Sequence, residues 1–141
     1  MAQDTLVASK IYVQADDATA YVVNVLGRYG VSAEHAKIVA ACLVAADLRG
    51  VDTHGVNRIP SYVERIRQGV LDPKAEPTLK EVTPVVAQVD GRNAFGFVAA
   101  HLGMSKAISM AKIYGIGMVS VKHSNHFGMS AWLVQIGRAH V

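Results

Sequence analysis

The sequence predicts an α/β fold, in which an N-terminal helical segment precedes the start of a mixed or parallel sheet with crossover helices. Apolar residues recur at three- and four-residue steps in three stretches between residues 16 and 68. Two stretches rich in β-branched residues follow at 85–89 and 116–122, and a helical pattern separates them. Because parallel strands need such a crossover, this order predicts a βαβ unit.

Three helices are expected in the first half of the chain, over residues 16–29, 33–49 and 57–68. Ser32 has the hydroxyl of an N-cap for the second helix. Pro60 has no N–H to donate and is acceptable only in a first turn, so the third helix begins close to it. A glycine follows each helix as a natural end: Gly30, Gly50 and Gly69.

The second half alternates strands and helices. Residues 72–84 contain three prolines and are expected to form an extended crossing segment. The strands at 85–89 and 116–122 flank a helix over about 98–114, and a fifth helix is expected to start near Gly128. A polar cluster follows the second strand, at the strand end where α/β proteins place their ligands.

The chain is expected to divide into a helical segment, residues 1–70, and the start of an α/β nucleotide and substrate domain, residues 71–135. The last six residues, Ile136 to Val141, match one in-frame translation of a common sequencing-library adapter. We interpret residues 136–141 as a non-native tail and the rest as part of a longer gene product.

Composition excludes several classes of function. The 141 residues carry a net charge of +3 with no Lys/Arg block, so a nucleic-acid partner is not expected. The longest apolar run, Ile38 to Ala46, is far shorter than the roughly 20 residues of a membrane span. A single cysteine, Cys42, excludes an internal disulfide and suits the core of a soluble cytoplasmic protein.

His54 and Arg58 are the first candidate pair for chemistry. They lie four residues apart at the mouth of the third helix, a spacing that lets both side chains reach one cavity. Arginine binds a carboxylate through two parallel hydrogen bonds, and histidine exchanges protons near neutral pH. The pair suits a 2-keto or 2-hydroxy acid, with Thr53 adding a hydrogen bond. The alternative is a helix-capping histidine beside an arginine on a solvated face.

The run His123-Ser124-Asn125-His126 is the second candidate. Its two histidines invite a metal site, and hence a metal-dependent lyase or hydrolase, but a zinc site needs three or four ligands and no third is obvious nearby. The other interpretations are residues that line a ligand site, or a polar loop in a non-catalytic interaction module. The chain contains no G-x-G-x-x-G motif of a Rossmann turn.

In the order of these motifs the sequence resembles the malate/L-lactate dehydrogenase family of NAD(P)-dependent oxidoreductases, which do not have a Rossmann fold. The resemblance runs from about residue 10 to 135. The matching stretches are Ala46 to Arg58, Gly69 to Pro73, Val89 to Gly91, Gly115 to Gly117 and Ser124 to Gly128.

The resemblance implies hydride exchange between NAD or NADP and a 2-keto or 2-hydroxy acid. It implies that His54 is the acid/base, that Arg58 and Thr53 bind the substrate, that His126 is a second catalytic residue and that Asn125 contacts the cofactor. It also implies a family-specific non-Rossmann α/β fold and a homodimer. Family members are much longer than this chain, so the 141 residues alone are expected to be inactive.

Overall fold

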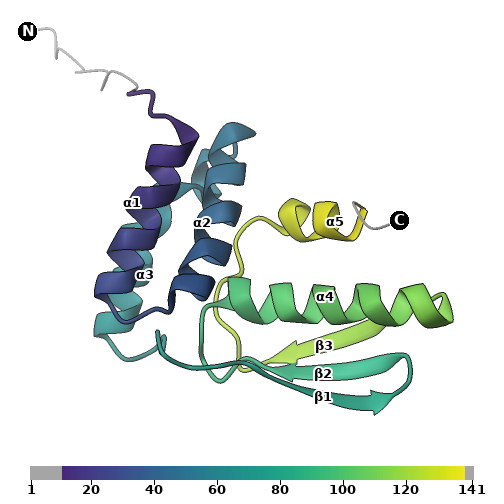
Figure 1. Ribbon diagram of the computed structural model, residues 1–141. Helices are drawn as coiled ribbons and strands as arrows, with labels where there is room; N and C mark the ends of the chain where they lie inside the picture. The colour runs from purple at the N-terminus through teal and green to yellow at the C-terminus, as the bar shows by residue number, and fades with distance from the viewer. Residues whose placement is uncertain (1–10, 139–141) are drawn as a thin grey trace, which may run out of the picture.

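The computed structural model describes residues 11–138, in which two helices form a hairpin at the N-terminal side (Figure 1). Helix α1 is Ala15–Arg28 and helix α2 is Ala33–Leu48. The predicted N-cap is confirmed, since the Ser32 hydroxyl accepts a hydrogen bond from the His35 N–H at 3.2 Å. Helix α2 has buried residues around most of its surface, because α1 and α4 pack against it from different sides.

Two short 3₁₀ turns, η1 (Asp52–His54) and η2 (Val56–Arg58), connect α2 to helix α3 (Ile59–Arg67). The third helix was expected from residue 57, and the α-helical part begins two residues later because η2 occupies its start. Pro60 lies in the first turn of α3, as its missing N–H requires.

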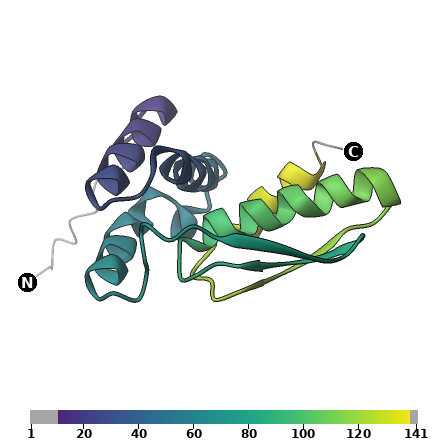
Figure 2. The ribbon, with the colours of Figure 1, turned by 60° about the horizontal axis from the view of Figure 1, so that its bottom comes forward.

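A mixed sheet of three strands forms the second half, with the order β1-β2-β3. Strands β2 (Val86–Asp90) and β3 (Met118–Lys122) are parallel, and helix α4 (Gly96–Tyr114) is the crossover between them, so the predicted βαβ unit is confirmed. Helix α4 covers one face of the sheet, and α5 (Ser130–Arg138) lies beyond it (Figures 1 and 2). The extended interpretation of residues 72–84 was incomplete, because Thr78–Thr83 forms strand β1, antiparallel to β2.

One apolar core joins the helical hairpin to the start of α4. It contains Leu26, Leu43 and Tyr62 from the first three helices together with Phe95 and Phe97, which flank Gly96 at the N-terminal end of α4. Residues on both sides of position 70 therefore share this core.

Cys42 is fully buried, as predicted, and burial raises the pKa of its thiol. Within residues 11–138, no helix has the length and apolar character needed to cross a membrane. Helix α5 includes the first three residues of the predicted non-native tail, and residues 139–141 lie outside the described part.

Candidate active site

The segment that carries His54 and Arg58 is fixed by Asp47 at the end of α2. The Asp47 carboxylate accepts a hydrogen bond from the Val56 N–H at 2.8 Å, which satisfies a free donor at the start of η2. Gly55 makes this contact possible, because a Cβ at that position would lie 1.6 Å from the carboxylate oxygen. The local fold therefore uses Asp47 to hold the turn between the two candidate residues.

The structure brings His54 and His126 together across 72 positions of sequence (126 − 54). Their rings stack with centroids 5.5 Å apart and an angle of 30° between the planes. His126 lies on the segment that follows β3, and the C-terminal ends of both parallel strands face the helical segment (Figure 1). Thr53 adds a hydrogen bond of 2.9 Å between its hydroxyl and Nδ1 of His54. These three residues thus form one cluster.

Tyr62, from the middle of α3, joins this cluster through its contact with the His126 ring. Its side chain is 1% exposed, and its hydroxyl lies 2.9 Å from Nδ1 of His126. The rings of Phe95 and Phe97 pack edge-on against Tyr62, with centroids at 5.8 and 5.6 Å. The Gly128 N–H also donates to Nδ1 of His126, at 3.3 Å. His126 is therefore held from two sides at the same ring nitrogen.

The electrostatics of the cluster keep His126 neutral. Burial is the main cause that lowers the pKa of His126, and the positive charges of Arg58, His54 and Arg65 lower it further. Burial likewise raises the pKa of the Tyr62 hydroxyl, although the Arg58 guanidinium opposes this. Near neutral pH, both groups are therefore uncharged hydrogen-bonding partners.

Arg58 brings a positive charge to this group of rings. Its Nε atom is buried and has no hydrogen-bond partner within residues 11–138, and none of the ion pairs formed there includes its guanidinium. A buried polar atom without a partner costs about 1–3 kcal/mol, and native proteins contain few such atoms. An anionic group next to the two histidines would complete it here.

Asn125 is fixed by its neighbours on both sides of the amide. Its Oδ1 accepts a hydrogen bond from Arg65 at 2.8 Å, and its Nδ2 donates to the carbonyls of Asn93 and Ala94 at 2.9 and 3.2 Å. An amide oxygen has two lone pairs, so Oδ1 keeps one for a further donor. Asn125, the residue before His126, is thus bonded both to α3 and to the turn after β2.

Gly96 is the closest contact between helix α4 and this loop. A Cβ at Gly96 would lie 2.0 Å from the Asn125 carbonyl oxygen and 2.6 Å from that of His126. We expect Gly96→Ala to push the loop away and lower the free energy of unfolding by about 2–3 kcal/mol, as overpacking in a core does. The matched control is Gly27→Ala in α1, where nothing lies within 4 Å. Urea denaturation of both variants should show loss of stability for Gly96→Ala alone; equal midpoints would contradict the expected collision.

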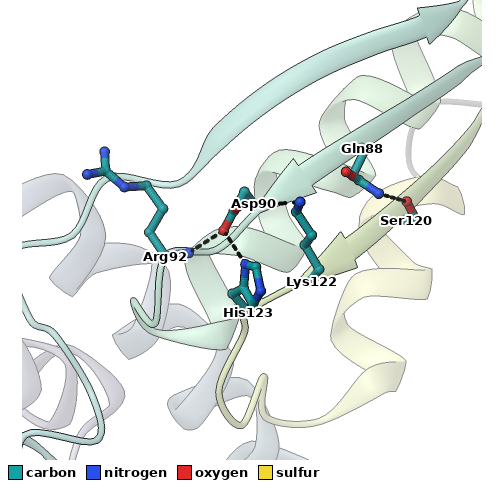
Figure 3. Close-up of polar contacts among 6 residues, drawn as sticks. All are labelled: Gln88, Asp90, Arg92, Ser120, Lys122 and His123. Carbon is teal, nitrogen blue, oxygen red and sulfur yellow. Dashed lines mark hydrogen bonds and ion pairs between the residues drawn. The ribbon is translucent and has the colours of Figure 1, made fainter.

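His123 belongs to a separate polar cluster at the ends of β2 and β3 (Figure 3). Its Nδ1 lies 3.0 Å from Asp90, which also accepts from the Arg92 N–H at 3.0 Å. Both hydrogen bonds lower the pKa of the Asp90 carboxyl, and the bond from the Arg92 N–H has the larger effect. His123 and His126 therefore bond to different partners. In the part of the chain that the structure describes, no group of three His, Cys, Asp or Glu side chains could hold a metal ion.

Two residues of the site were not predicted from the sequence. In the sequence, Tyr62 lies on the apolar side of the third helix and Arg65 on its charged side, so neither stands out as a site residue. Their bonds to His126 and Asn125 span 64 and 60 positions, so no local pattern marks them. The spacing of three residues between them, one helical turn, was the available signal that both face the same neighbour.

The fold and this cluster define an α/β protein whose site combines two imidazoles with a guanidinium that forms no ion pair within residues 11–138, a set suited to a small organic acid. Comparison with known sequences is more specific. The sequence model of the family described as malate/L-lactate dehydrogenase matches residues 13–138, and the chain belongs to this family.

Named relatives of this chain are dehydrogenases as well. The chain is 38% identical over 120 residues to a malate/(S)-sulfolactate dehydrogenase from Methanothermus fervidus, a match that covers 85% of this chain and 35% of the relative. It is 39% identical over 112 residues to a ureidoglycolate dehydrogenase (NAD(+)) from Escherichia coli, covering 79% of this chain and 32% of the relative. The chain thus spans about a third of the length of the curated relatives it matches.

Solved structures show the same fold. The malate dehydrogenase of Entamoeba histolytica superimposes with a TM-score of 0.90 at 38% identity, over 94% of this chain and 37% of that chain. The malate dehydrogenase of Pyrococcus horikoshii does so with a TM-score of 0.86 at 39% identity, over 89% and 36%. The predicted α/β fold of this family is therefore confirmed for the described residues.

Proposed function

We propose that the whole protein is an oxidoreductase that transfers a hydride between a nicotinamide cofactor and a 2-hydroxy or 2-keto acid. The observation that carries this proposal is the Arg58 guanidinium, which forms no ion pair within residues 11–138 and lies beside the stacked rings of His54 and His126. Such a site offers a fixed cation for a carboxylate and a proton carrier for the neighbouring oxygen. Relatives named for malate, sulfolactate and ureidoglycolate support the substrate class.

In the proposed reduction, Arg58 binds the substrate carboxylate through two parallel hydrogen bonds. The protonated ring of His54 then gives a proton to the keto oxygen as the carbonyl carbon gains a hydride, which yields the 2-hydroxy acid. Oxidation runs the same steps in reverse, with His54 accepting the hydroxyl proton. Thr53 supports this role because its hydroxyl bonds Nδ1 of His54 and fixes the ring.

The nicotinamide, when bound, supplies or accepts the hydride. Asn125 is the residue of this chain that we propose beside it, since the free lone pair of its Oδ1 suits the carboxamide N–H of a nicotinamide. His126 is the proposed second catalytic residue and faces the same substrate oxygen. A homodimeric assembly and a cytoplasmic location remain predictions from the sequence, and NAD and NADP remain alternative cofactors.

The test is oxidation of NADH and of NADPH by the whole protein, followed at 340 nm with pyruvate, oxaloacetate and related keto acids. We expect turnover with at least one keto acid and none with acetone, which has the carbonyl of pyruvate without its carboxylate. Equal rates with pyruvate and acetone would remove the role of Arg58, and no turnover with any keto acid and either cofactor would overturn the proposal.

A further inference from the structure

The two contacts at Nδ1 of His126 decide which ring nitrogen carries the hydrogen. Two groups approach Nδ1, the Tyr62 hydroxyl at 2.9 Å and the Gly128 N–H at 3.3 Å. A backbone N–H can only donate, so Nδ1 must present its lone pair. The hydrogen of a neutral His126 ring is therefore on Nε2.

The direction of the Tyr62 hydroxyl hydrogen follows from its other neighbour. The Arg58 guanidinium lies close enough to act on the Tyr62 oxygen, and a guanidinium has donors but no acceptor. The hydroxyl hydrogen must point away from Arg58, and Nδ1 of His126 is the acceptor within reach. The edge-on rings of Phe95 and Phe97 restrict any rotation of the tyrosine ring away from this position.

We propose that Tyr62 is a positioning residue, which holds His126 as the Nε2–H tautomer and aims that N–H into the acid-binding site. Within residues 11–138, no hydrogen bond engages Nε2 of His126, so this donor is available to a ligand. The inference deepens the proposed function and rests on it, because it assigns separate tasks to the two histidines. His126 donates a hydrogen bond to the keto oxygen without releasing its proton, and His54 alone delivers the proton.

A tyrosine at position 62 sets the tautomer of His126 and fixes its N–H as a neutral donor. A neutral donor fixed on the keto oxygen polarises the carbonyl before the hydride arrives, and it needs no reorganisation during the reaction. The hydrogen-bond partner of one ring nitrogen sets which nitrogen of a histidine carries the hydrogen. A phenylalanine would fill the same volume in the core but would leave Nδ1 to the longer Gly128 contact.

The direct test is the tautomer of His126, measured by two-bond ¹H–¹⁵N correlation NMR with ¹⁵N-labelled histidine. His126 is assigned by the signal lost in a His126→Gln sample. In the unchanged protein we expect a pyridine-type Nδ1 and a pyrrole-type Nε2. In Tyr62→Phe the ratio of the two tautomers should shift about fivefold toward Nδ1–H, the change that a lost ordinary hydrogen bond produces. The matched control is Tyr29→Phe, which removes the hydroxyl that accepts from Arg67 at 2.9 Å, far from the histidines in sequence.

A pyrrole-type Nδ1 in the unchanged protein would overturn the proposal, and so would a tautomer ratio that is the same in Tyr62→Phe and Tyr29→Phe. The first outcome is measured on the unchanged protein, so the proposal can be contradicted even if Tyr62→Phe does not fold. In the whole protein, Tyr62→Phe should lower kcat about tenfold and leave KM for the keto acid within about twofold, the size of effect expected for loss of an orienting partner. The NMR measurement uses no substrate, so failure of the proposed reaction and failure of the positioning role give separate results.

Discussion

Replacing Arg58 with alanine is expected to lower kcat/KM for 2-keto acids by about 10²- to 10³-fold in the whole protein, since removing one partner of a desolvated charge pair costs about 2–5 kcal/mol. The reason is the geometry of the site. Arg58 forms no ion pair within residues 11–138, so its positive charge is available to a substrate carboxylate. We expect most of the effect in KM, because a carboxylate is present in both the ground state and the transition state.

Stability should respond differently from activity in this variant. Arg58→Ala removes a buried Nε that has no partner and a guanidinium that forms no ion pair within residues 11–138, so the free energy of unfolding should not fall by more than about 1 kcal/mol, the typical size for a single substitution. Arg58→Lys keeps the charge but loses the two-pronged geometry, and we expect it to recover only part of kcat/KM. The matched control is Arg67→Ala at the C-terminal end of α3, since the Arg67 side chain bonds Tyr29 instead. Similar activity losses at positions 58 and 67 would contradict a specific carboxylate site.

The strongest sequence signals concerned local structure, and the structure confirms most of them. Helix limits followed from Ser32, Pro60 and the glycines, because capping and the absence of an N–H act within a few residues. Strand β1 was missed for a physical reason. It is an edge strand with only one partially buried residue, Leu79, so its sequence lacks the apolar alternation that marks a strand facing a core.

The candidate site was predictable in part. His54 and His126 were chosen from separate motifs, and a strand end at residue 122 made their approach plausible. Asp47 accepts a hydrogen bond from the Val56 N–H in a turn that Gly55 permits, and no pattern in the sequence marks this contact. Tyr62 and Arg65 were not found, because their partners lie 60 or more positions away and a tyrosine on the inner face of a helix has the same pattern as ordinary core.

Replacing His54 with glutamine is expected to lower kcat for keto-acid reduction by about 10²- to 10⁴-fold, the contribution of a general acid/base. Glutamine retains hydrogen-bonding groups of similar reach but cannot carry the proton that the keto oxygen requires. KM should change little, because Arg58 remains in place to bind the carboxylate. His54 is the residue for this task because burial and three neighbouring positive groups lower the pKa of His126, which leaves His126 neutral near pH 7.

The control for this variant is His123→Asn. His123 has φ +48°, a left-handed conformation that asparagine adopts more readily than most residues, and its side chain bonds Asp90 in a separate cluster. We expect His123→Asn to keep kcat within about twofold, as substitutions away from a site do. A metal-dependent enzyme that used His123 and His126 would show the reverse order, with activity lost in His123→Asn and retained in His54→Gln. Measuring kcat for both variants in one assay therefore distinguishes the two mechanisms.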